Sequence, residues 1–260
     1  MIARPRICLY YDGAGYDAYI LMCWRKGVFL AMICVLTAGG IRPANAEAAA
    51  PAPLTTAQIV DEMQRHNQAR ADGLKHVKSI RHYAAEYRGF SKVIDAKMEV
   101  EYHFDASTGK SFRIVTQSGS KMLCDKVLKR AVKSEKEAWQ EKEATGLTIA
   151  NYSFRLVGSE NLSGRLVYLL EVKPLVASKF LYKGKIWVDA AEFAVMKMEV
   201  EPVRNPSFWI ERTRILQTYA KTGDFWLPEQ NRSETKVRIG GTAVFTIDFG
   251  TYQIDLNAAH

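Results

Sequence analysis

A two-residue period in hydrophobicity, repeated along most of the chain, is the feature that most restricts its fold. It is clearest over Lys97–Phe104, where apolar and charged or polar residues alternate strictly. Because successive side chains of a strand point to opposite faces, this alternation predicts a half-buried antiparallel strand. The same period predicts neighbouring strands over 81–90 and 111–117, with a turn at 108–109 between the second and third strands.

The alternation resumes after Gly146 and continues almost to the C-terminus. Leu166, Tyr168, Leu170 and Val172, for example, occupy one phase of a single alternating segment. Successive strands with hairpin-length connections predict one antiparallel sheet of roughly ten strands, which must curl or close to protect its edges. The later strands are predicted over 180–189, 193–201, 209–219, 225–239 and 242–254.

Two segments have helical periodicity instead. The first follows Thr55, a good N-cap, with Gln58 placed to complete a capping box and Gly73 placed to end the helix. The second spans 120–142, where apolar residues recur at helical spacing opposite a face rich in Lys and Arg. We therefore predict a single α+β domain, in which one curved sheet carries two helical pieces on its concave side.

The first 46 residues have the parts of an export leader. Two basic residues precede an apolar run too short to span a bilayer, and 44–46 form an Ala-x-Ala cleavage motif. We interpret 22–46 as a cleaved signal peptide and 1–21 as an over-extended gene start, with Met22 as the initiator; an uncleaved anchor is the alternative. The predicted product is periplasmic, with a flexible tether over 47–53, a domain over 54–256 and a tail over 257–260.

Composition and charge exclude several classes of protein. With 48% hydrophobic and 25% charged residues, the chain is close to an average globular protein, which argues against disorder and a polytopic membrane protein. The formal net charge of +8 falls to +5 for residues 47–260, because the leader holds five basic and two acidic residues. This mild excess suits weak attraction to an anionic membrane surface and does not require nucleic acid.

Of the four cysteines only Cys124 lies within residues 47–260, so we predict a buried, unreactive thiol and no internal disulfide.

No arrangement of residues indicates catalysis. The sequence contains neither a His-Glu-x-x-His zinc motif nor a Gly-x-Ser-x-Gly elbow. Gly109-Lys110-Ser111 lacks the earlier glycine of a phosphate loop, and paired carboxylates such as Glu99 and Glu101 fit a solvated strand face better than a glycosidase pair. We therefore predict no catalytic residue, no metal and no cofactor; an enzyme acting on lipids is the least favoured alternative.

Large apolar side chains gather on the face of the sheet that is predicted to be concave. A curved sheet lined in this way either fills its interior or leaves an apolar cavity, as lipocalin-like cups do, and the periodicity is compatible with both. The predicted ligand-contacting residues are Tyr102, Phe104, Phe112, Leu123, Val127, Tyr168 and Trp209, with Phe245 and Phe249 on the same face.

The other face of the 120–142 segment is strongly basic. It is either the solvated side of a helix that caps the core or a surface that contacts a membrane or a partner protein. The predicted contact residues are Lys126, Lys129, Arg130 and Lys133.

Part of this pattern resembles a known family. The segment 181–202, LYKGKIWVDAAEFAVMKMEVEP, resembles the strand–turn–strand hairpin of periplasmic lipoprotein carriers of the LolA type, and Phe225-Trp226-Leu227-Pro228 running into 233–237 is similar to them as well. The resemblance implies an unclosed antiparallel β-barrel of about eleven strands with helices as a lid. In the carriers an arginine on an early strand latches that lid, and Arg81 and Arg88 are both candidates.

The residues and the resemblance together favour a non-enzymatic, monomeric periplasmic carrier. It would bind acyl chains of a lipoprotein or a lipid in its apolar concavity and deliver them to the outer membrane. An inner- or outer-membrane protein is a further candidate partner, and no nucleic acid is expected. The alternative is an envelope-sensing protein-interaction module that uses the basic helix 120–142.

Overall fold

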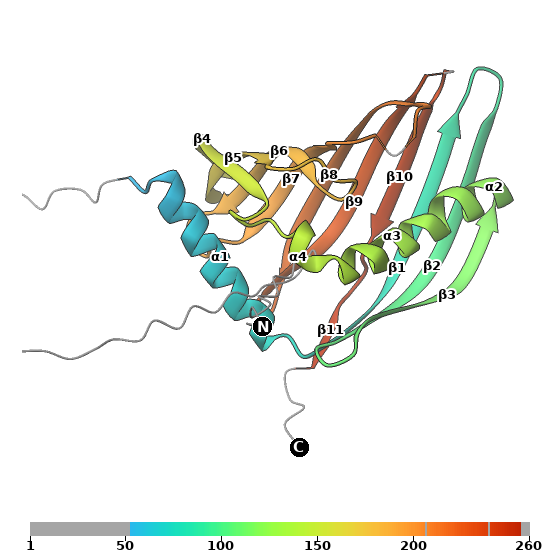
Figure 1. Cartoon of the computed structure of the whole chain (residues 1–260). Helices are drawn as coiled ribbons and strands as arrows, with labels where there is room; N and C mark the ends of the chain where they lie inside the picture. The colour runs from blue at the N-terminus through green and yellow to red at the C-terminus, as the bar shows by residue number, and fades with distance from the viewer. Residues whose placement is uncertain (1–52, 206, 239, 256–260) are drawn as a thin grey trace, which may run out of the picture. The chain divides into compact units, whose positions relative to one another are not determined.

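The computed structural model describes residues 53–255 apart from 206 and 239. The predicted signal peptide, most of the tether and the C-terminal tail lie outside these residues. Eleven strands and two main helical segments make up the described part (Figure 1). The helical elements are α1 (Thr56–Gly73), α2 (Lys121–Leu123), a π-helical turn (Cys124–Leu128), α3 (Lys129–Gln140) and α4 (Lys142–Thr145).

The strands follow the predicted order closely. Three precede the second helical segment and eight come after it. They are β1 (His76–Arg88), β2 (Val93–Asp105), β3 (Gly109–Gly119), β4 (Tyr152–Leu162), β5 (Arg165–Pro174), β6 (Tyr182–Asp189), β7 (Val195–Pro202), β8 (Ile210–Thr222), β9 (Phe225–Val237), β10 (Thr242–Asp248) and β11 (Gln253–Asp255).

All strand pairs are antiparallel, and the order across the sheet is β3-β2-β1-β10-β9-β8-β7-β6-β5-β4, with β11 also paired to β1. Within the described residues β3 and β4 are the two edges and do not pair with each other, so the sheet is unclosed. The predicted α+β class and unclosed antiparallel barrel are confirmed. Register shifts interrupt several ladders, one of them between Glu99 and Val100, and such irregularities help a sheet to bend.

The prediction of one continuous strand over 242–254 is wrong. Strand β10 ends at Asp248, and β11 begins at Gln253 further along β1. Between them Gly250 has a φ of 64°, and a Cβ at this position would clash with the carbonyl oxygen of Ile80. The chain therefore passes β1 too closely here for a regular ladder, and only glycine fits.

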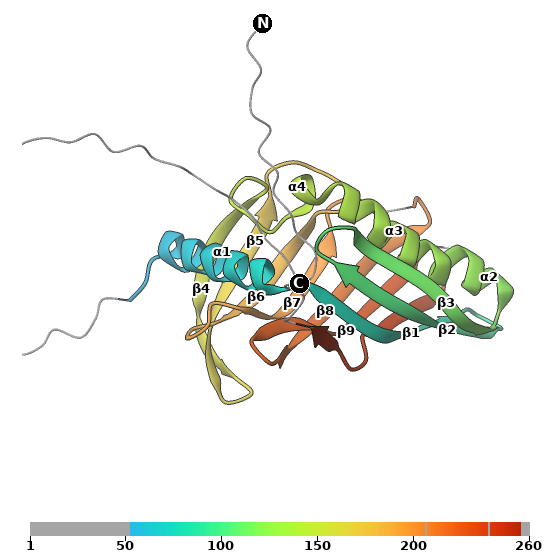
Figure 2. The same cartoon turned by 90° about the horizontal axis from the view of Figure 1, so that it is seen from below.

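Helix α1 forms as predicted. The Thr55 hydroxyl accepts a hydrogen bond from the backbone N–H of Gln58, whose side chain accepts one in return from the N–H of Thr55 at 2.9 Å. Its apolar stripe is buried, because Ile59, Val60 and Met63 are at most 2% exposed. Helix α1 contacts β4, at one end of the strand order (Figure 2).

The second helical segment is not the single helix predicted over 120–142. A π-helical turn separates α2 from α3, and α3 ends at Gln140. The buried residues Cys124, Leu128 and Val132 are spaced by four. In an α-helix that spacing drifts by about 40° per step, and a wider turn offsets the drift. The segment contacts β1, β2 and β3, at the other end of the strand order from α1 (Figure 2).

The core beneath this segment is continuous with the sheet. Inward side chains of β1 and β2, such as Tyr83, Met98 and Val100, pack with Leu128 and Cys124. Cys124 is 4% exposed, as predicted for an inert thiol. The helix is thereby seated on the sheet mainly through its N-terminal half.

Candidate functional site

A cavity of about 350 Å³ lies between α3 and the inner face of the sheet. Its wall combines small residues of α3 with larger side chains from β6 to β10. Most of the wall is apolar or aromatic, which suits an apolar ligand better than a polar one. Its main lining residues are Ala131, Ala138, Trp139, Leu147, Tyr152, Phe180, Tyr182, Met198, Val200, Ile215, Tyr219, Pro228, Phe245, Ile247 and Phe249.

The few polar groups of the wall contact one another. The Asn231 side-chain amide donates to the Gln217 side-chain oxygen at 2.8 Å, and the Tyr219 hydroxyl lies 3.3 Å from the sulfur of Met198. Buried polar groups that are paired in this way do not demand a polar ligand. They leave the apolar surface of the wall as its main feature.

A charged cluster joins the helix to the sheet at one side of the cavity. The Arg81 Nη1 of β1 donates to both carboxylate oxygens of Glu135 in α3, at 2.8 and 3.0 Å. Lys110 Nζ of β3 lies 3.2 Å from the same carboxylate. Arg81 and Lys110 are 3% and 2% exposed at the side chain, whereas Glu135 is 24% exposed. One carboxylate on the helix thus contacts two buried cations on the sheet.

The pKa values of the cluster show how strongly its charges are coupled. Burial by itself would raise the pKa of Glu135, but the charges of Arg81 and Lys110 lower it to about 2. Burial would lower the pKa of Arg81, and the Glu135 carboxylate instead raises it. Burial also raises the pKa of the neighbouring Tyr83 to about 12. The ion pair is therefore fully charged at neutral pH.

Aromatic rings hold the Arg81 guanidinium in place. Its central carbon lies 3.5 Å from the centre of the Tyr102 ring, 4.8 Å from that of Phe249 and 5.6 Å from that of Phe112. Such cation–π contacts are strongest for desolvated cations. Arg88, the other arginine considered from the sequence, is exposed and pairs with Glu86 of its own strand. Only Arg81 of the two contacts the second helical segment within the described residues.

The predicted ligand residues of β2 and β3 lie in the packed core beside the cavity rather than in its wall. Tyr102 is 5% exposed and packs on Phe112 with the rings tilted by 57° and their centres 5.4 Å apart. Phe104 contacts Trp139 edge to face, and Trp139 in turn lines the cavity. These side chains support the wall from behind, and their role in ligand binding stays a prediction.

The other predicted ligand residues are dispersed. Leu123 and Val127 pack with the core under the helix, and Tyr168 stacks on Phe193 of the β6–β7 turn. Trp209 is 55% exposed in the β7–β8 loop. None of these four is among the residues that line the cavity as described. Phe245 and Phe249, placed on the same face by the periodicity, do line it.

Alternation along the chain indicates the position of one residue of the cluster and of none of the others. Arg81 shares the phase of Ser79 and Tyr83, so alternation alone puts it on the inner face of β1. Spacing in the sequence cannot pair Arg81 with Glu135, because Glu135 lies 54 residues further along the chain, in α3. Nor can it pair Glu135 with Lys110, which lies 25 residues before it, in β3. The small residues Ala131 and Ala138 can be recognised as part of a cavity wall only when α3 is known to cover a cavity.

The four basic residues predicted as a contact surface are divided by their local pairing. Lys129 lies 2.8 Å from Asp125, and Lys133 lies 3.8 Å from Glu137. Lys126 and Arg130 are exposed and have no ion-pair partner among the residues described. Their use as a contact surface stays a prediction.

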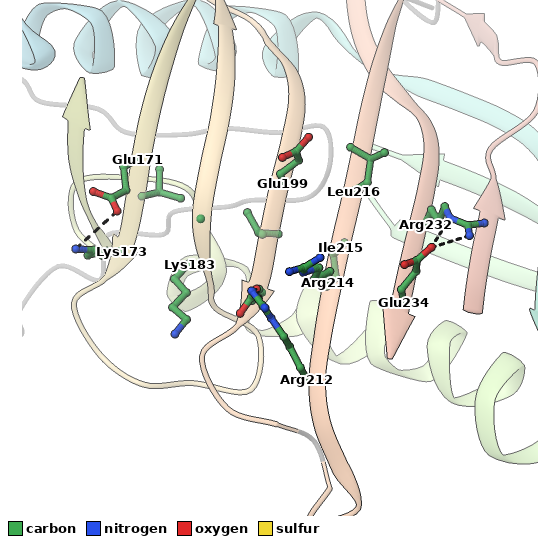
Figure 3. Close-up of a pocket in the computed structure, with 14 residues that line it drawn as sticks. Glu171, Lys173, Lys183, Glu199, Arg212, Arg214, Ile215, Leu216, Arg232 and Glu234 are labelled. Carbon is green, nitrogen blue, oxygen red and sulfur yellow. Dashed lines mark hydrogen bonds and ion pairs between the residues drawn. The ribbon is translucent and has the colours of Figure 1, made fainter. Parts of the chain in front are cut away.

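A second, open pocket of about 540 Å³ lies on the opposite face of the sheet (Figure 3). Charged side chains from β5 to β9 surround it, and several of them pair. Arg212 of β8 pairs with Glu201 of β7 across the strands, and Arg232 pairs with Glu234 within β9 at 2.8 Å. Arg214 is exposed and has no ion-pair partner in the described part of the chain. The two charge signs are mixed, and this pocket shows no preference for one class of ligand.

Searches for other kinds of site in the described ranges gave no candidates. Residues 53–255, apart from the two gaps, contain no cluster of His, Cys, Asp or Glu that could hold a metal ion. No described helix is both long and apolar enough to cross a bilayer.

Comparisons with known proteins return similarity at the level of structure. No protein-family model matches the chain, and no curated protein matches its sequence. A DUF1329 family protein from Desulfovibrio piger is 16% identical over 78% of this chain and 95% of its own, with a TM-score of 0.43. A putative outer membrane lipoprotein-sorting protein domain from Vibrio parahaemolyticus is 14% identical over 75% and 92%, with a TM-score of 0.38.

A LolA superfamily protein from Nitrosomonas europaea is also similar, with 11% identity over 78% of this chain and 94% of its own and a TM-score of 0.34. At such identities the comparison concerns the fold alone. The topology described above supplies the detail: eleven antiparallel strands, two unpaired edges, one helix before the first strand and a helical segment after the third. The described residues thus form an unclosed antiparallel β-barrel with helices on its inner side, the architecture that the resemblance to LolA-type carriers implied.

Proposed function

We propose that this protein is a non-enzymatic carrier that holds an acyl chain of a lipoprotein or lipid in the cavity beneath α3. The observation that supports this most is the cavity itself, whose wall is mostly apolar and whose roof is a helix. The predicted export leader supports a location in the periplasm, where acyl chains bound for the outer membrane must cross water.

The physical basis of binding would be burial of apolar surface. Each methylene removed from water contributes about 0.8 kcal/mol. The cavity volume of about 350 Å³ lies near the lower end of the range of about 300–1,000 Å³ found for small-molecule sites. The site as described therefore has room for one slender apolar group, and a bulkier ligand requires α3 to move.

Helix α3 is well suited to such movement. Val132 is its only buried residue, whereas α1 buries Ile59, Val60, Met63 and Asn67. Segments with few buried apolar contacts open at the lowest free energy. The charged cluster of Arg81, Lys110 and Glu135 is then the main contact that keeps α3 closed, and we propose that it acts as the latch.

Filling the cavity tests the proposal. Ala138→Phe adds a ring inside the wall, and Ala144→Phe adds the same ring at an exposed position of α4. We expect Ala138→Phe to weaken binding of a fluorescent fatty acid by at least about tenfold, since 1.4 kcal/mol lost corresponds to that factor. Ala144→Phe should bind as the wild type does, and both should keep the wild-type circular dichroism.

Native mass spectrometry of protein purified without detergent from the periplasm gives an independent answer. A discrete added mass of lipid or acyl-peptide size in the wild type, absent from Ala138→Phe, would support the carrier and identify its cargo. A bare polypeptide that also fails to bind the fatty acid would contradict the proposal. It would favour instead the protein-interaction alternative, for which exposed Lys126 and Arg130 are the residues to reverse.

A further inference from the structure

Four loops meet at one end of the sheet. In an antiparallel sheet every second connection falls at the same end. The register places the β1–β2, β5–β6, β7–β8 and β9–β10 connections together, because Arg88 pairs with Thr242 and Tyr182 with Pro202. We call this set the loop rim; its described residues are 89–92, 175–181, 203–205, 207–209, 238, 240 and 241.

The loop rim exposes large apolar side chains. Phe90 is 91% exposed, Phe208 74% and Trp209 55%. Leu175 and Val176 add exposures of 57% and 64% from the β5–β6 connection. Single exposed apolar residues are common, but a gathering of five on one rim marks a surface that is covered in use.

Contacts between the loops hold three of these side chains in one group. A Cβ at Gly240 would overlap the Phe90 ring, so this ring lies directly on the β9–β10 turn. The backbone N–H of Arg238 donates to the Trp209 carbonyl at 2.8 Å. The Arg238 guanidinium lies 5.1 Å from the ring centre of Phe208, which packs on Trp209. The rings therefore come from two loops, and the β9–β10 loop contacts both of these loops through Gly240 and Arg238.

The charge of the loop rim has a single sign. Its four loops contain Lys92, Lys179, Arg204 and Arg238 and no acidic residue, and of these cations Lys179 pairs with Glu137 of α3 at 3.0 Å. The turns at the other end of the sheet, 106–108, 163–164, 190–194, 223–224 and 249–252, contain Glu192 and Asp224 and no basic residue. Aromatic and apolar side chains among Lys and Arg are the combination that binds the interface of an anionic bilayer.

We propose that the loop rim docks the protein on an anionic membrane surface. Phe90, Phe208 and Trp209 enter the headgroup region, while Arg204, Arg238 and Lys92 face lipid phosphates. An anionic protein partner would also satisfy the cations, but it does not account for exposed aromatic rings from two loops beside one turn. This inference goes beyond acyl-chain carriage and does not depend on it.

Vesicle co-sedimentation tests the proposal on the full chain as the cell exports it. The probes are vesicles of phosphatidylglycerol mixed with phosphatidylcholine, and vesicles of phosphatidylcholine alone. We expect binding to the anionic vesicles and at least about tenfold weaker binding after Phe90→Ser, Phe208→Ser and Trp209→Ser are combined. The matched control combines Val157→Ser and Leu166→Ser, which also remove exposed apolar side chains but lie on β4 and β5 away from the loop rim. It should bind as the wild type does.

Two further variants locate the charge that matters. Arg204→Glu with Arg238→Glu should weaken binding to the anionic vesicles, whereas Lys126→Glu with Arg130→Glu, the same charge change on the helices, should not.

A blue shift of tryptophan fluorescence on adding anionic vesicles should disappear in Trp209→Phe, which keeps the apolar contact. Equal losses in the two reversal variants, or wild-type binding by the serine triple variant, would overturn the proposal. So would a wild type that ignores both kinds of vesicle, a result that leaves cavity filling by Ala138→Phe as the separate test of carriage.

Discussion

At the scale of single residues, the unusual feature is a buried ion cluster that joins a helix to two strands. Arg81 and Lys110 are almost fully buried, and the Glu135 carboxylate contacts both. The Arg81 Nε has no hydrogen-bond partner among the described residues. Buried ion pairs add little net stability, but breaking one by removing a partner is costly. The cluster is therefore best understood as a contact that sets the position of α3.

We expect Glu135→Gln to loosen that contact. It removes the negative charge that faces both buried cations, so the free energy of unfolding should fall by about 3 kcal/mol, the lower end of the range for broken buried pairs. Exchange of a bound fluorescent fatty acid should become faster, because α3 opens more often. The control is Asp125→Asn, which removes a carboxylate from the neighbouring turn that pairs only with exposed Lys129. Urea titration and stopped-flow displacement measure the two effects, and equal behaviour of both variants would contradict the latch.

The same carboxylate gives the protein a defined acid limit. Its pKa is about 2 in the folded protein, below the value of 4.5 expected when unfolded. A lowered folded-state pKa contributes stability above the unfolded value, and this is lost as the pH falls through the folded value. The contribution of Glu135, about 3 kcal/mol by that shift, should thus be constant from pH 8 to 5 and decline from about pH 4.5 toward 2. Unfolding curves of the wild type and Glu135→Gln should converge over that acid window; a constant gap down to pH 2 would refute the assignment.

At the scale of elements, glycines decide where strands can approach each other. Gly184 of β6 has a φ of 151°, and a Cβ there would clash with the Glu199 carbonyl oxygen of β7. Gly158 of β4 has open space around the same position. The two residues are both glycines within strands, yet only the first is required by its neighbours.

Alanine substitution should therefore have opposite effects at these two glycines. Gly184→Ala forces β6 away from β7 and should lower the free energy of unfolding by more than about 1 kcal/mol, a cost typical of backbone strain. Gly158→Ala should raise it slightly, by at most about 1 kcal/mol, because glycine is unfavourable inside a strand. Thermal unfolding measures both, and a Gly184→Ala variant as stable as the wild type would disprove the close approach.

Most elements could be predicted from the sequence because the sheet buries one face. That burial imposes a two-residue period, which the chain shows from β2 to β10, and the capping box of Thr55 and Gln58 located α1 to the residue. The break at Gly250 could not be predicted, since it depends on the distance to β1. The residues of the cavity wall could not be predicted for a similar reason. Periodicity identifies the inner face of the sheet, but not the part of that face against which the helices fail to pack closely.

At the scale of the whole described domain, the two helical segments divide the inner face. Helix α1 contacts β4 at one end of the strand order, and the α2–α3 segment contacts β1, β2 and β3 at the other (Figure 1). The strands between them supply most of the cavity wall. The proposed ligand site is thus the part of the concavity that neither helical segment fills, and the loop rim lies at one end of the same strands.

The unpaired edges of β3 and β4 have one more consequence. In a closed barrel, the number of strands and their shear fix the radius, so the lumen cannot grow unless ladder hydrogen bonds break. Here no ladder joins the two edge strands within the described residues. The circumference is free to increase at that seam while every existing strand pair stays intact. A domain of this kind can adjust the width of its interior to ligands of different cross-section by bending of the sheet alone, without breaking hydrogen bonds between strands.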